Sequence, residues 1–181
     1  MIKNIFKAAA LFAALGGVAQ ADTLYDFSYT FTDGAVVSGS MDGTLSGTTL
    51  NNISNVTINW SGQSFAGTLL GGQFNGTNFV FGAPVVSTVA SQNNFIFSDA
   101  TDPSAANNFF YFVNNGSPSG GSNATEVVVN SFLVTNNPAD SDITTGGTWS
   151  LTAAPVPLPP ALPLLLSGLG LFALSRRRRA A

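Results

Sequence analysis

The amino-acid sequence predicts an all-β protein: an antiparallel β-sandwich or jelly-roll-like body, flanked by an N-terminal signal helix and a C-terminal transmembrane helix. Apolar and polar residues alternate along much of 22–154, and clusters of Gly, Asn, Asp and Ser interrupt the alternation at short intervals. The flanks are predicted because two strongly apolar stretches lie near the chain ends, with all six basic residues beside them. We therefore expect a signal peptide (1–21), an extracytoplasmic domain (22–154) and a sorting or anchor segment (155–181).

The first of these parts has the layout of a secretory signal. Two lysines precede an apolar stretch, 8–15, that is too short to span a bilayer. Ala19 and Ala21 then form a small-x-small cleavage site. We therefore expect the protein to be exported through the inner membrane, and cleavage after Ala21 would release its body outside the cytoplasm.

The clearest strand of the body is predicted over residues 25–31, where aromatic residues occupy every second position. It ends at Asp33–Gly34, a strong signal for a hairpin turn. Asp42–Gly43 is the same kind of signal and predicts a second turn, with turn duty for both aspartates. The remaining strands are expected at 36–41, 56–60, 64–70, 79–81, 85–89, 95–97, 109–113, 126–135 and 148–152.

The C-terminal segment combines a proline-rich stretch, an apolar helix and a basic end. The prolines favour an extended approach to the membrane, with a transmembrane helix over about 161–175. The arginines that follow would hold that end in the cytoplasm by the positive-inside rule. They are Arg176, Arg177, Arg178 and Arg179.

In this order the three elements resemble the PEP-CTERM protein-sorting domain, in its VPLPA variant. The residues that match the sorting motif are Val156, Pro157, Leu158, Pro159 and Ala161, with Pro160 inserted before the alanine. The resemblance implies that an exosortase, a membrane transpeptidase-like enzyme, recognises the segment, cuts near the motif and passes the protein to the cell surface. It also implies a role beside exopolysaccharide and extracellular matrix. A plain C-terminal anchor that is never cut predicts the same topology.

Composition excludes several classes of function. The chain has no Cys and no His, which removes disulfides, thiol nucleophiles, imidazole bases and metal centres built on those residues. No basic residue lies between Ala8 and Ser175, whereas all nine acidic residues do. Phosphate backbones would repel such a body, so we expect no nucleic-acid partner.

Two acidic pairs are candidate calcium ligands, Asp99 with Asp102 and Asp140 with Asp142. Neither completes a known calcium-loop pattern, and capping of loops is the favoured role for each pair. We therefore predict no metal site and no cofactor.

Three residues bear on enzymatic and carbohydrate-binding roles. Glu126 opens an alternating run, so we expect it on the solvent face of a strand, without the apolar setting that a general acid requires. Trp60 and Trp149 could stack on sugar rings, but each alternates in phase with apolar neighbours, which favours the core. The sequence thus predicts a non-enzymatic structural or adhesive surface protein. A carbohydrate- or calcium-binding β-sandwich module at the cell surface is the alternative.

Overall fold

A computed structural model describes residues 22–100, 106–114, 116, 118, 125–133, 139–143 and 146–155. Within these residues the protein is all-β, as predicted: the strands form two antiparallel sheets, and a single 3-10 turn, η1 (Ala90–Gln92), is the helical element. The predicted signal helix and transmembrane helix lie outside the described residues. In the described part, no helix combines the length and the apolar character that crossing a bilayer requires.

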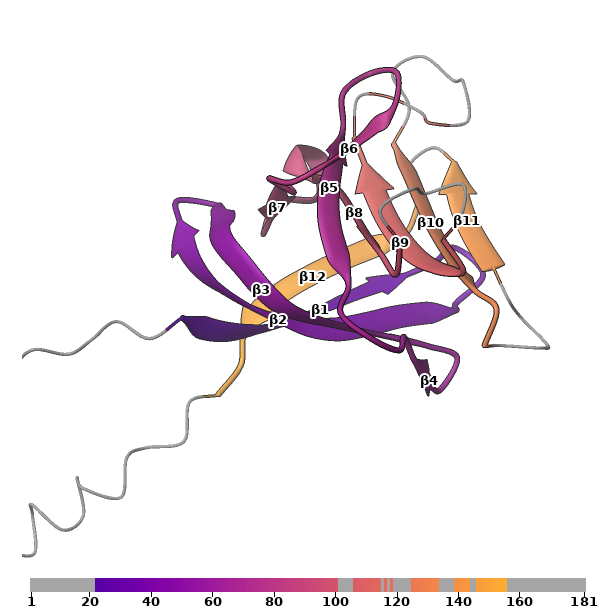
Figure 1. Ribbon diagram of the computed structural model, residues 1–181, viewed down its shortest axis with the longest axis horizontal. Helices are drawn as coiled ribbons and strands as arrows, with labels where there is room; N and C mark the ends of the chain where they lie inside the picture. Colours follow the sequence, from indigo (N-terminus) through magenta and orange to yellow (C-terminus); the bar gives the residue numbers. More distant parts are fainter. Residues whose placement is uncertain are drawn as a thin grey trace, which may run out of the picture.

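The first sheet, sheet A, carries both ends of the body (Figure 1). Its order is β12-β1-β2-β3-β4, with β7 paired to β3 as well. The bounds are Thr23–Thr30 (β1), Val36–Ser46 (β2), Thr49–Trp60 (β3), Gln63–Ser64 (β4), Val86–Ser87 (β7) and Thr148–Ala153 (β12).

The second sheet, sheet B, has the order β11-β10-β9-β8-β5-β6. Most neighbours in both sheets are consecutive in the chain, and the arrangement is sandwich-like because the two sheets share one core. The bounds are Leu70–Phe74 (β5), Phe79–Phe81 (β6), Asn94–Ser98 (β8), Asn108–Val113 (β9), Glu126–Ser131 (β10) and Ala139–Ile143 (β11).

One hydrophobic core joins the facing sides of the two sheets. The alternation in β1 points its aromatic side chains inward, where Phe27 stacks on Phe110 of sheet B with ring centroids 6.0 Å apart and planes 2° apart. Tyr29 meets Phe112 edge-on at 5.6 Å. Without disulfides in the chain, this aromatic packing is the main source of stability.

The predicted end of the second strand was wrong because residues typical of turns occur inside the strand. Asp42–Gly43 does not end β2, which continues to Ser46 with register shifts on either side of Asp42. Asp-Gly is compatible with a bulge, and a Cβ on Gly43 would lie only 2.7 Å from the side chain of Leu50. The turn instead contains Gly47, whose φ is +63°.

Other strand boundaries also differ from those predicted. Strand β3 begins at Thr49 and not at 56, because Asn52 and Asn55 adopt left-handed φ angles and stay within the strand. The predicted strand 64–70 is divided between the end of β4 and the start of β5. Strand β10 stops at Ser131, and β11 was not predicted.

The two ends of the described body lie side by side. Strands β1 and β12 pair from Tyr25–Ala153 to Thr30–Thr148. Beyond the last pair the Ala154 N–H donates to the Leu24 carbonyl at 2.8 Å. The segments before β1 and after β12 therefore join the domain at the same end of sheet A (Figure 1).

Candidate functional site

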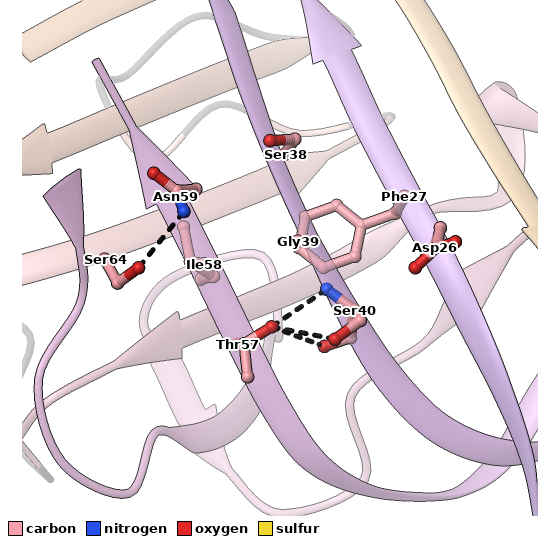
Figure 2. A pocket seen from close by; sticks show the side chains of 9 residues that line it. All are labelled: Asp26, Phe27, Ser38, Gly39, Ser40, Thr57, Ile58, Asn59 and Ser64. Carbon is pink, nitrogen blue, oxygen red and sulfur yellow. Dashed lines mark hydrogen bonds between the residues drawn. The ribbon is translucent and has the colours of Figure 1, made fainter. Parts of the chain in front are cut away.

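A shallow groove lies over β1, β2, β3 and β4 of sheet A (Figure 2). Its volume is about 340 Å³, which falls at the lower end of the range for small-molecule sites, about 300–1,000 Å³. Polar residues that alternate with core residues along these strands supply most of the lining, because successive side chains point to opposite faces of a sheet. The lining residues are Asp26, Phe27, Ser38, Gly39, Ser40, Thr57, Ile58, Asn59 and Ser64.

Strand register brings the polar lining residues together from distant parts of the chain. Ser40 and Thr57 are directly opposite, and their hydroxyl oxygens lie 2.8 Å apart, while the Ser40 N–H donates to Thr57 Oγ1 at 3.1 Å. Between β3 and β4, the side-chain amide of Asn59 donates to Ser64 Oγ at 3.1 Å. Hydroxyls and amides both donate and accept hydrogen bonds, so the groove suits a neutral, hydroxyl-rich ligand.

The charge of the lining residues further restricts the kind of ligand that the groove can bind. Of the residues that line the groove, Asp26 alone is charged. The described residues include no Lys, Arg or His, so nothing in this part of the chain could neutralise an anionic ligand. Sequence reasoning missed the groove because its residues are spread over four strands. The available signal was the Ser and Thr at alternate positions of the predicted strands.

Gly39 forms part of the groove floor, and its missing side chain is required by packing. Phe27 is its direct cross-strand partner, and the Phe27 ring lies against it (Figure 2). A Cβ on Gly39 would lie 2.6 Å from the Phe27 ring and 2.0 Å from the Thr57 carbonyl oxygen. Any other residue here would push the ring or β3 away, so the groove floor and the core are coupled at this position.

A second polar cluster joins the two sheets at Asp142 of β11. The Tyr29 hydroxyl donates to Asp142 Oδ2 at 2.8 Å, and the Thr32 hydroxyl donates to Oδ1 at 2.6 Å. The Thr32 N–H adds a contact of 3.2 Å to Oδ2. Burial, followed by the hydrogen bond to Asp142, raises the pKa of the Tyr29 hydroxyl above its usual range.

Asp140 lies beside this cluster. Burial raises the pKa of the Asp140 carboxyl, and the nearby carboxylates of Asp33 and Asp142 add to the shift, while the N–H of Ser141 opposes it. The prediction that Asp140 and Asp142 occupy a loop was wrong, because both lie on β11. The pattern suggested a loop because Asp is uncommon in strands, but Asp142 is accommodated by its hydrogen bonds to Tyr29 and Thr32, whereas Asp140 accepts the N–H of the adjacent Ser141.

The other pair of calcium candidates, Asp99 and Asp102, is described only in part. Asp99 accepts the Asn107 N–H at 2.9 Å and the Asn108 amide at 2.6 Å, as the predicted loop-capping role requires. Asp102 lies outside the described residues. Across the described ranges, no group of three or more His, Cys, Asp or Glu side chains is arranged to hold a metal ion.

The predicted position of Glu126 on a solvent face was wrong. Its side chain is 0% exposed and accepts a hydrogen bond from the Tyr111 hydroxyl. The alternation correctly directs Glu126 away from the main core, because Val127 and Val129 point into it. The outer side of sheet B, however, carries a second apolar cluster. Its residues are Phe74, Ile96, Tyr111 and Val113, with Phe79, Phe109 and Val128 against them.

Both tryptophans belong to the core side of the fold, as predicted. Trp60 is 1% exposed and meets Phe31 edge-on. Trp149 is half-buried, stacks on Phe27 at 5.9 Å and donates its indole N–H to the Ser87 carbonyl at 2.7 Å. Trp60 is too buried to stack on a sugar, whereas Trp149 is partly exposed and lines a pocket of about 180 Å³.

The predicted cleavage site, sorting motif and arginine cluster lie outside the described residues. The described body ends at Pro155, immediately before the first motif residue, Val156. No known family model, no curated protein and no solved structure matches this chain.

Proposed function

We propose that this protein is an exported, non-enzymatic surface protein with a structural or adhesive role, delivered by an exosortase-type system. The C-terminal order of proline motif, apolar stretch and four arginines carries the proposal. The protein crosses the inner membrane, is held there at least transiently by its tail, and then passes to the cell surface or the extracellular matrix. Its partners are the membrane, the processing enzyme and surface glycans such as exopolysaccharide.

The structure of the body is consistent with this route. Strand β12 ends at Ala153, three residues before the first residue of the proposed motif, so cleavage near the motif would leave every described strand within the released body. The segments at both ends also join one end of sheet A. An anchored molecule would therefore present the opposite end of the body away from the membrane.

Intact mass of the mature protein from a host with the processing enzyme tests the proposal. We expect a C-terminus near Val156. The double variant Pro157→Ala, Pro159→Ala should accumulate with its tail while remaining in the membrane fraction. Pro163→Ala, outside the motif, is the matched control and should be processed normally. A wild-type terminus at Ala181 would instead establish a permanent anchor, and full-length protein free in the lysate would contradict both forms of the proposal.

The groove on sheet A favours a second candidate function, binding of a neutral glycan. Hydroxyl and amide groups line it, and the sole charge, on Asp26, excludes anionic sugars as preferred ligands. Calorimetric titration with neutral and uronic-acid oligosaccharides tests this. We expect heat with neutral sugars only, and its loss in Asn59→Ala. Ser28→Ala, on β1 but outside the groove lining, should bind as the wild type does; equal binding by Asn59→Ala would reject the groove as the site.

A further inference from the structure

We infer that β12 is a pairing edge through which two copies of this chain join their A sheets. Strand β12 ends sheet A, and β1 is its sole strand partner in the described part of the chain. An edge strand presents unpaired backbone groups that another strand can use. The inference goes beyond the proposed function and does not depend on it.

The other sheet edges are protected, and β12 is not. Strand β4 has two residues and β6 has three, too short to pair well. Strand β11 carries two aspartates, and charge on an edge discourages pairing with another strand. Strand β12 has six residues, TWSLTA, with no charge and no proline. Of the strands that end the two sheets, it is therefore the longest and the one without a feature that would prevent association. In the described part of the chain, the outer side of β3 between β7 and β4 also lacks a strand partner, but the left-handed residues Asn52 and Asn55 interrupt it.

The register shows which backbone groups are free. Because the Ala154 N–H donates to Leu24, this pair is a hydrogen-bonded pair, and such pairs alternate with non-hydrogen-bonded pairs along an antiparallel ladder. Every second residue of β12 therefore points its N–H and C=O away from β1. These residues are Trp149, Leu151 and Ala153.

A twofold axis through Leu151 would give hydrogen-bond partners to the outward backbone groups of all three residues. It places Leu151 opposite its own copy and Trp149 opposite the second Ala153, so each outward-pointing residue faces another outward-pointing residue. On the other face Ser150 lies opposite Thr152 of the second copy. Apolar residues face apolar residues, and hydroxyls face hydroxyls, a combination that stabilises cross-strand pairs.

The self-complementary register identifies a second copy as the partner, and the neutrality of β12 lets that copy approach. Between residues 8 and 175 the chain has nine acidic residues and no basic one, so two bodies repel each other over most approaches. A self-association surface must then be neutral on both sides, and β12 supplies such a surface. The nearest carboxylate in the register, Asp26, lies on β1 opposite Thr152 and not on the edge itself.

Matched proline variants test the direction of the backbone groups. Sedimentation of the purified full-length protein in detergent should show a monomer–dimer equilibrium. Ala153→Pro removes an outward N–H and should raise the dimer dissociation constant at least about tenfold, while the melting temperature of the monomer, measured at a protein concentration below the dissociation constant, stays unchanged. Thr152→Pro removes an N–H directed at β1 and should lower the melting temperature. A wild type that stays monomeric, or an Ala153→Pro protein that dimerises as strongly as the wild type, would overturn the inference.

Cysteine cross-linking tests the register, and the chain has no native cysteine to interfere. A mixture of Ser150→Cys and Thr152→Cys proteins should form a disulfide-linked dimer under mild oxidation, because opposite residues lie within disulfide reach. Each variant alone should not, since the diagonal separation is about 7–8 Å. Cross-linking by either single variant to the same extent, or none from the mixture, would reject the pairing.

Discussion

Replacing Asp142 with alanine should destabilise the protein by about 2–4 kcal/mol. The change removes the acceptor for the Tyr29 hydroxyl, whose residue is 3% exposed, and for both donors of Thr32. A hydrogen bond to a charged group contributes about 1.5–3 kcal/mol, and a buried hydroxyl left without a partner costs about 1–3 kcal/mol. Water can replace the contacts of Thr32, which are only part-buried, so the loss at Tyr29 dominates.

Urea unfolding followed by tryptophan fluorescence measures this loss, because Trp60 and Trp149 lie in and against the core. With a denaturant dependence of about 2 kcal/mol per molar urea, the midpoint should fall by about 1–2 M. Tyr29→Phe should lose less, and the double variant should lose less than the sum of the two single changes. Ser141→Ala, on an exposed position of the same strand, is the control and should change stability by less than about 0.5 kcal/mol. A loss below about 0.5 kcal/mol for Asp142→Ala would refute the reasoning.

Two further substitutions, one on β11 and one on β2, should also change stability. Because the pKa of Asp140 is raised in the folded state, its carboxylate lowers stability as the pH rises through the carboxyl range. Asp140→Asn should therefore raise the urea midpoint at pH 7 and raise it less at pH 3. An equal change at both pH values would contradict this. Gly39→Ala should lower the free energy of unfolding by about 2–3 kcal/mol in the same assay, because the new methyl group would meet the Phe27 ring and the Thr57 carbonyl. The neighbouring Ser38→Ala is the control and should be nearly neutral. Equal stability of the two variants would argue against the close approach at Gly39.

Strands were predictable from sequence where one face of a sheet is apolar and the other polar. Residues 25–31 show the clearest alternation, and the structure has β1 there with the expected side inward. The prediction failed at Asp42–Gly43 and at the asparagines of β3, where residues typical of turns form bulges inside long strands. Local composition cannot distinguish a bulge from a turn, because the difference depends on whether the partner strand continues.

The candidate site was less predictable than the fold. The groove residues come from four strands, and their proximity depends on register between segments that are up to 38 positions apart, such as Asp26 and Ser64. Glu126 was misplaced because the rule that a polar residue opposite a core face meets solvent fails where the outer face of sheet B has its own apolar cluster. Asp142 was misplaced because its partners, Tyr29 and Thr32, lie more than 100 residues away in the chain.

The pairing of β1 with β12 determines how the domain would respond to mechanical load. A pull on the C-terminal end of β12 along the strand axis would run parallel to the ladder from Tyr25–Ala153 to Thr30–Thr148. All the rungs are then loaded together in shear, instead of opening one after another as in a zipper. Such a geometry resists extraction of the last strand, which would suit a molecule that is held by its tail while flow drags on its body.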